Sequence, residues 1–88
     1  MRMATSYTTQ PDTIVARFIR ERQIALGIST RQLVIATGLG RTHVWFLRNG
    51  VRLPTFAETQ KKLARVLEID EQVFGDMVAM EVARRRAA

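Results

Sequence analysis

The stretch TRQLVIATGLGRTHVWFLRNG, residues 30–50, decides the fold of this chain. It predicts two short helices around the turn at residues 37–40, because the glycine at position 38 suits a backbone with positive φ. Four apolar residues are spaced to close a small core between these helices: Leu33, Leu39, Val44 and Leu47. The opposite side of the second helix then turns Thr42 and Asn49 toward solvent, flanked by Trp45 and Phe46.

Residues before and within this stretch predict where the first three helices start and end. Pro11 and Asp12 predict a helix start, and Gly27 predicts the end of that helix. Its apolar stripe consists of Val15, Phe18, Ile19 and Leu26. We expect Ser29 to cap the helix that Gly38 ends, and we expect the next helix over residues 41–49, before Gly50.

Two more helices are predicted after the stretch. Pro54 and Thr55 form a boundary, and Thr55 is the expected cap of a helix whose apolar face holds Leu63, Ala64 and Leu67. Asp70 is the expected cap of the last helix. Because no run alternates with a period of two for the length of a strand, the sequence predicts an all-α fold of five helices, or six, with short connections.

Composition narrows the classes of function. The 88 residues make one small domain, and an apolar fraction of 47% is enough for a packed core. Cysteine is absent and His43 is the only histidine, which argues against a disulfide framework, thiol catalysis and a metal site. The sequence has no nucleophile motif, no phosphate-binding loop and no carboxylate pair beside a base, so we expect neither an enzyme nor a cofactor.

The sequence also predicts a cytoplasmic protein that does not contact the membrane. No apolar run approaches the roughly 20 residues that span a bilayer. The N-terminal residues do not resemble a signal peptide, because they contain no hydrophobic segment.

Charge is placed unevenly along the chain. Residues 1–66 hold 11 basic and 3 acidic side chains, a net charge of +8, whereas residues 67–83 hold 5 acidic and no basic ones. A basic body suggests a face that binds a polyanion such as nucleic acid, although an arginine-rich domain without such a ligand has the same balance. The three arginines that follow either touch DNA or, as we favour, form a frayed basic tail: Arg84, Arg85 and Arg86.

Residues 14–75 resemble the helix-turn-helix domain of the Cro and phage-repressor type, which also occurs in antitoxins and restriction–modification controllers. The resemblance is carried by GIS at 27–29, QL at 32–33, TGL at 37–39, HVWFLRNG at 43–50, the arginine and proline of VRLPT at 51–55, and TQKKLARVLEID at 59–70. It implies a five-helix, lambda-repressor-like DNA-binding domain over residues 11–75. A flexible arm at residues 1–10 precedes this domain, and a helical C-terminal extension at residues 76–88 follows it.

The resemblance also implies roles for individual side chains, because the helix at residues 41–49 corresponds to the one that enters the major groove. Base edges would be contacted by Arg41, Thr42 and Phe46, with Arg41 at guanine and Phe46 at thymine methyl groups. The DNA backbone would be contacted by Thr30, His43, Arg48, Asn49 and Arg52. Trp45 would make an aromatic contact with DNA or a partner protein. In plainer interpretations, His43 is an ordinary surface residue, and Trp45 or Phe46 folds back on a neighbouring helix.

The sequence departs from the family pattern at several positions: Phe46 stands where a polar side chain is more common, and Val34 stands where the two helices usually meet through Ala. Two further departures, at Gly40 and Arg48, bear on how this helix starts and is held. Gly40 replaces the Ser or Thr that usually caps it, which weakens the helix start by up to about 1 kcal/mol. Arg48 stands where the family often has a Glu paired with an Arg of the first helix. The corresponding partner position is Gln23, so we expect the internal salt bridge to be missing and Arg48 to serve the phosphates.

Two functions from different classes are compatible with these observations. The first is a dimeric repressor of phage, mobile-element, antitoxin or controller type, which binds double-stranded DNA at a pseudo-palindromic operator. The second is a protein-interaction module on the same fold, such as an antitoxin whose main partner is a toxin. The apolar residues of the last helix either complete the core or, as we favour, form a two-fold dimer contact: Val73, Phe74, Met77 and Val78.

Overall fold

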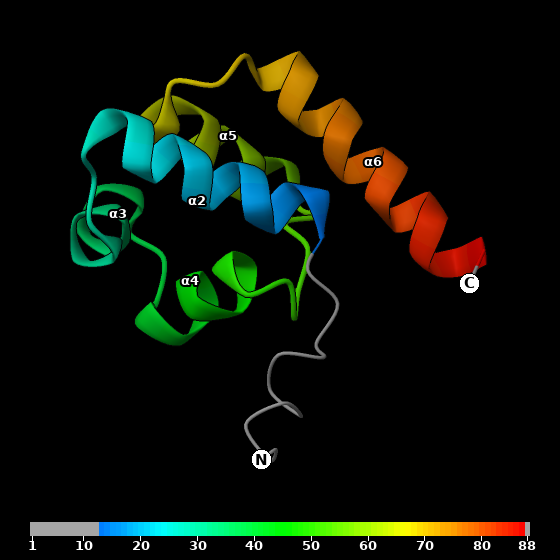
Figure 1. The fold of residues 1–88 in the computed structure, drawn as a ribbon, viewed down its shortest axis with the longest axis horizontal. Coiled ribbons are helices and arrows are strands. Elements are labelled where there is room, and N and C mark those ends of the chain that lie inside the picture. The colour runs from blue at the N-terminus through cyan, green and yellow to red at the C-terminus, as the bar shows by residue number, and fades with distance from the viewer. Residues whose placement is uncertain (1–12, 88) are drawn as a thin grey trace.

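Helices make up all the regular secondary structure of residues 13–87, which are the residues that the computed structural model describes (Figure 1). In chain order they are α2 (Ile14–Leu26), α3 (Thr30–Thr37), α4 (Arg41–Arg48), α5 (Ala57–Leu67) and α6 (Glu71–Ala87). The prediction of an all-α fold with five helices is confirmed for this part of the chain. The predicted arm at residues 1–10 and the predicted helix start at Pro11 and Asp12 lie outside the described residues.

Local signals set both ends of the first two helices, and those at Gly27, Ser29 and Gly38 are as predicted. The side chain of Thr13 caps α2 by accepting from the backbone N–H of Ala16, and Gly27 ends this helix with a left-handed backbone at φ 68°. Ser29 caps α3 in a reciprocal pair: its hydroxyl accepts from the N–H of Gln32, and the Gln32 side chain accepts from the N–H of Ser29.

The later helix starts are partly as predicted. Helix α4 begins after Gly40, which has no side chain to accept a hydrogen bond and leaves the first turn uncapped, as expected. The prediction for α5 is wrong by one residue, since Phe56 and not Thr55 precedes the first turn, and no side chain caps it. Asp70 caps α6 as predicted, because its carboxylate accepts from the N–H of Val73 at 3.0 Å.

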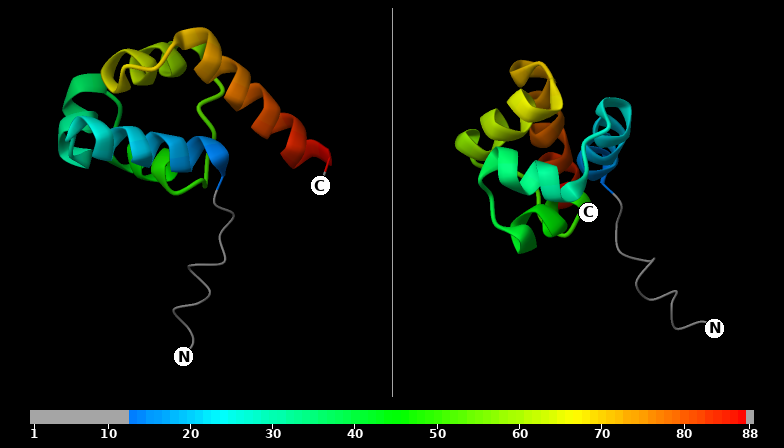
Figure 2. Two further views of the ribbon diagram at one scale, coloured as in Figure 1. Left: turned by 45° about the horizontal axis from the view of Figure 1, so that its top comes forward. Right: turned by 90° about the vertical axis from the view of Figure 1, so that its left-hand side faces the viewer.

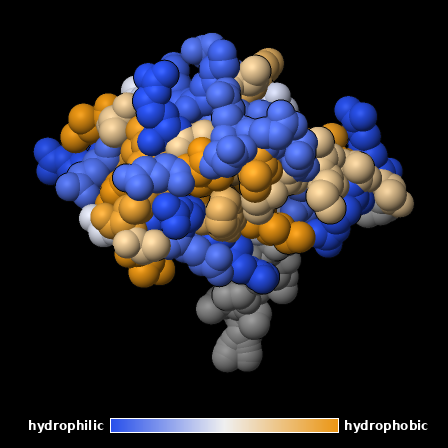
Figure 3. Space-filling model, turned by 90° about the horizontal axis from the view of Figure 1, so that it is seen from above, coloured by the Kyte–Doolittle hydropathy of each residue, from blue (hydrophilic) through white to orange (hydrophobic). Residues whose placement is uncertain are grey.

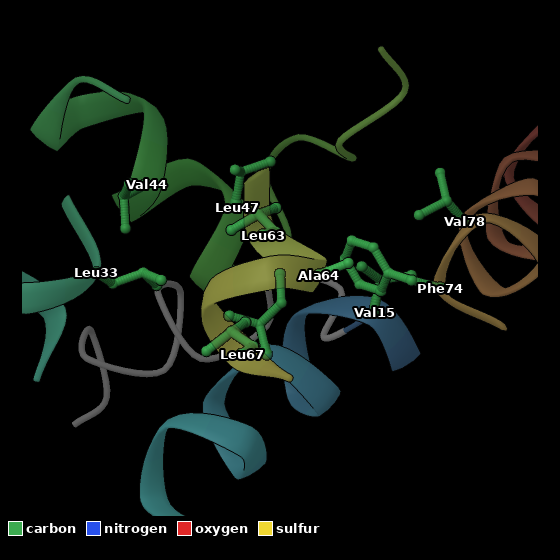
Figure 4. Packing of buried hydrophobic residues seen from close by; sticks show 10 residues of the cluster. Val15, Leu33, Val44, Leu47, Leu63, Ala64, Leu67, Phe74 and Val78 are labelled. Carbon is green, nitrogen blue, oxygen red and sulfur yellow. The ribbon is translucent and has the colours of Figure 1, made fainter. Parts of the chain in front are cut away.

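One hydrophobic cluster joins all five helices. Helix α2 packs against α4, α5 and α6, while α3 packs against α4 and α5. Figure 4 shows Leu33, Val44, Leu47 and Leu63 converging from α3, α4 and α5 at one end of this cluster, and residues of α2, α5 and α6 meeting at the other end. Three of the four residues predicted to close the small core are fully buried, and Leu39 packs against it from its edge.

Helix α6 belongs to this core, which corrects part of the dimer prediction. Phe74 and Val78 are exposed by only 0% and 2%, so they complete the core of the single chain and are not available to a second one. Val73 remains half-exposed and Met77 packs at the rim of the core. The interior of a helix is apolar whether it meets its own chain or a partner, and for this reason the sequence left both interpretations open.

The end of α6 is a continuous, docked helix. It runs unbroken from Glu71 to Ala87, so no structural boundary separates the predicted domain from the predicted extension at residue 76, and the prediction of a frayed tail is wrong (Figures 1 and 2). The carboxylate of Glu81, 5% exposed, accepts from the backbone N–H of Ile14 at 2.9 Å and pairs with Arg84 at 3.4 Å. This acid therefore joins the middle of α6 to the positive N-terminal end of α2.

The surface mixes hydrophilic and hydrophobic residues. Figure 3 shows the molecule from above relative to Figure 1. On this face, hydrophilic and hydrophobic residues lie next to one another. Among residues 13–87, no helix has both the length and the apolar character needed to cross a membrane.

Candidate nucleic-acid interface

Helix α4 packs on one side and faces solvent on the other. Val44 and Leu47 are each 1% exposed and fill the core between α3 and α4. On the other side Arg41 and Thr42 are exposed, and Trp45 is 51% exposed. The predicted division of this helix into an inner and an outer face is therefore confirmed, and two of the three predicted base-contacting residues lie on the outer face.

The third, Phe46, is held by its neighbours and is only partly exposed. Its ring meets that of Trp45 edge-on, with 5.7 Å between centroids and 68° between planes. The guanidinium of Arg52 lies over the Phe46 ring, 5.3 Å from its centroid. The backbone N–H of Arg52 also donates to the carbonyl of Phe46, so Arg52 contacts Phe46 through both its backbone and its side chain. Phe46 therefore positions the guanidinium of Arg52 at the end of α4.

Asn49 follows the last residue of α4, and the NH2 group of its side chain is hydrogen-bonded to that helix. Its Nδ2 donates to the carbonyl of Trp45 at 2.8 Å, and its backbone N–H donates to the same carbonyl. The side chain therefore caps the C-terminal end of the helix. The predicted contact of Asn49 with the DNA backbone stays a prediction.

Arg48 does not point outward as predicted, and this is a correction. Its Nε donates to Oε1 of Gln23 at 2.6 Å, and its backbone carbonyl accepts from the guanidinium of Arg20. Burial, together with the charge of Arg20, lowers the pKa of Arg48 from its usual value. The salt bridge of the resembled family is absent, but a hydrogen bond between the same two positions replaces it and holds α4 on α2.

The other predicted backbone contacts lie around the ends of α3 and α4. Thr30, half-buried at the start of α3, lines an apolar hollow with Arg31, Val34, Ile35 and Arg41. His43 is half-buried on α4 and lines a second hollow together with Arg52. Arg85 of α6 also lines this second hollow, which the sequence did not predict. No local signal marks that position, because the contact joins segments far apart in the chain.

The charged side chains of the segment that contains α3 and α4 are all of one sign. Residues 22–57, which include all of α3 and α4, contain five arginines and no aspartate or glutamate. An outer helix face without carboxylates, bordered by arginines, attracts polyanions and does not repel them. Within residues 13–87 no group of acidic or histidine side chains is placed to hold a metal ion.

A scan against protein-family models found no match, and neither did searches of curated proteins and of solved structures.

Proposed function

We propose that this chain is a sequence-specific, double-stranded DNA-binding transcriptional regulator of the cytoplasm, which acts as a dimeric repressor on a pseudo-palindromic operator. In this proposal α3 and α4 act as a lambda-repressor-like helix-turn-helix unit. The observation that carries it is the outer face of α4, where Arg41 and Thr42 stand exposed on a helix whose other side is locked in the core. Such a helix fits the major groove of B-DNA.

The roles proposed for Arg41 and Arg52 follow from where each side chain lies relative to α4. Arg41 lies on the outer face at the N-terminal end of α4, where recognition helices meet base edges. Arg52 follows α4 and is fixed over Phe46, which suits a contact with a phosphate at the edge of the groove. Base contacts specify a sequence, while phosphate contacts position the protein on any sequence.

The first test is selection of binding sites from a random duplex pool at physiological salt with the purified protein. We expect an inverted repeat whose half-sites are about one helical turn, roughly 10 bp, apart. The variant Arg41→Ala should relax the selected sequence at one base position. Arg52→Ala should weaken binding to all sequences alike and lower the salt dependence of log K by about one.

The alternative function is a protein-interaction module, such as an antitoxin whose main partner is a toxin. The observation that favours it is Trp45, a large aromatic residue that is half-exposed beside Phe46. If the pool yields no enriched sequence and Arg41→Ala leaves duplex affinity unchanged, the outer face of α4 does not recognise DNA and this alternative takes its place.

A further inference from the structure

A hollow of about 330 Å³ joins the end of α6 to the segment that follows α4. It is bordered by one residue from each of α4, α5 and α6 and by the loop between α4 and α5: His43, Thr59, Arg85 and residues 51–56. Two arginines, a histidine and a threonine are therefore among the residues that line one small space, and no aspartate or glutamate lines it.

Thr59 is the buried polar group of this hollow. The residue is 8% exposed, and its hydroxyl makes no hydrogen bond within the described part of the chain. Buried hydroxyl groups are nearly always hydrogen-bonded in folded proteins. A buried hydroxyl without a partner, in a hollow that two arginines also line, favours a ligand that accepts hydrogen bonds.

Arg85 is held in place at the rim of the hollow. Its Nη2 donates to the carbonyl of Gly50, 35 residues away in the chain, just after α4. The helix that carries it is docked through Phe74 and Val78 and through the bond from Ile14 to Glu81. One N–H of the guanidinium is thus used for positioning, and its other N–H groups are left to bind a ligand.

The chemistry of these groups selects a phosphate. The guanidinium group of an arginine can donate two parallel N–H hydrogen bonds to phosphate oxygens, and a hydroxyl group can donate a further one. The guanidinium of Arg52 lies over the Phe46 ring, and both Arg52 and Arg85 line the hollow. A phosphate between them would meet donors from α6 and from the loop together.

We propose that this hollow, which we call the α6 phosphate site, binds a backbone phosphate of the DNA that α4 contacts, with Arg85 and Thr59 as its donors beside Arg52. The inference rests on the proposed function and extends it, because it makes the C-terminal helix part of the DNA interface. The site lies next to Gly50, which follows the C-terminal end of α4, so it adjoins the helix that is proposed to occupy the groove.

The test compares two arginines of the same helix. Binding of a duplex of mixed sequence is titrated over a range of salt for the natural chain, Arg85→Ala and the control Arg86→Ala, which removes the same charge outside the hollow. We expect Arg85→Ala to lower the slope of log K against log salt by about one, and Arg86→Ala to change it much less. Thr59→Val should weaken binding by about tenfold without changing the slope, since it removes a hydrogen bond and no charge.

Folding is controlled separately, because Arg85 also ties α6 to Gly50. Arg85→Lys keeps the charge and should keep most of the slope, and thermal melting followed by circular dichroism confirms that each variant is folded at the assay temperature. If Arg85→Lys and Arg85→Ala give the same reduced slope, the charge is not the cause and the proposal is overturned.

The remaining outcomes separate this inference from the proposed function. If the natural chain binds the duplex and Arg85→Ala and Arg86→Ala behave alike, the α6 phosphate site is overturned while DNA binding stands. If the natural chain binds no duplex, the proposed function fails, and the proposal fails with it. A titration with inorganic phosphate, followed by the amide NMR signals of Gly50 and Thr59, then identifies a site for a free anion.

Discussion

At the scale of single residues, the hydrogen bond between Gln23 and Arg48 decides how α4 is held on α2. Gln23 is 4% exposed; its amide oxygen accepts from Arg48 and its nitrogen donates to the carbonyl of Ile28 at 3.3 Å. Arg48 is half-buried, and its burial together with the charge of Arg20 lowers the pKa of its guanidinium from the usual value. A half-buried guanidinium of this kind is stabilised by the acceptor of its charge-assisted hydrogen bond.

We therefore expect Gln23→Leu to lower the free energy of unfolding by about 1–3 kcal/mol, because it leaves the Nε of Arg48 without its acceptor. Urea denaturation of the single variant, of Arg48→Met and of the double variant measures the coupling between the two side chains. The free energy of unfolding of the double variant should fall by less than the sum of the decreases in the two single variants. Strict additivity of the two losses would show that the bond contributes nothing.

The sequence predicted the correspondence between positions 23 and 48 but not the bond. The residue types there differ from those of the resembled family, so the expectation was a missing salt bridge and an arginine turned to phosphate. Whether an arginine points inward depends on the neighbours it meets across 25 residues of chain. The same holds for Phe46, whose ring is fixed by Arg52.

At the scale of helices, two glycines in one short turn have opposite requirements. Gly38 ends α3 at φ 73°, a backbone that a side chain disfavours by about 1–2 kcal/mol. Gly40 precedes α4 at φ −65°, an ordinary value for any residue, and a Cβ there would meet nothing within 4 Å. Only the first of the two positions needs glycine.

The same substitution at both positions should therefore have opposite effects. Gly40→Ser supplies the missing cap of α4 and should raise the free energy of unfolding by a few tenths of a kcal/mol. Gly38→Ser should lower it by about 1 kcal/mol. Thermal melts of the two variants, at identical composition, measure the difference. Two variants that destabilise equally would contradict the assignment of Gly40 as an uncapped helix start.

Helix ends were well predicted wherever their cause is local. Gly27, Ser29 and Asp70 act through hydrogen bonds or a backbone angle within four residues, which the sequence displays directly. The start of α5 was missed by one residue, because no side chain caps it and the side chain of Thr55 plays no part in it. Where packing rather than a cap sets the boundary, spacing alone does not locate it.

At the scale of the molecule, α6 closes the core of the chain. We expect Phe74→Ala, at a fully buried position, to lower the free energy of unfolding by about 3–5 kcal/mol. Met80→Ala, on the same helix but 67% exposed, should change it by less than about 0.5 kcal/mol. Urea denaturation of both variants measures this contrast. Equal and small effects would mean that α6 is not docked.

The contacts that dock α6 could not be predicted from the sequence. Glu81 meets Ile14 across 67 residues and Arg85 meets Gly50 across 35, and neither pair has a local pattern. The apolar stripe on the last helix predicts that these residues are buried. It does not show whether they pack against the same chain or against a second copy. The sequence therefore predicted the elements and the inner residues of the fold, while the closure of the molecule had to come from the structure.

We place the proposed dimer contact on the part of α6 that the core leaves exposed. Val73 and Met80 are 50% and 67% exposed, and they stand two helical turns apart, on one face.

The double variant Val73→Glu/Met80→Glu should therefore stay folded but fail to dimerise, because it places two like charges in an isologous contact. Sedimentation over a range of concentrations should show a monomer–dimer equilibrium for the natural chain and a monomer for the variant, with unchanged helical content by circular dichroism. On a duplex carrying one half-site the two proteins should bind equally, since each half-site meets a single α4. A variant that dimerises as tightly as the natural chain would move the two-fold contact away from α6, and a natural chain that stays monomeric at high micromolar concentration would leave the operator to single copies.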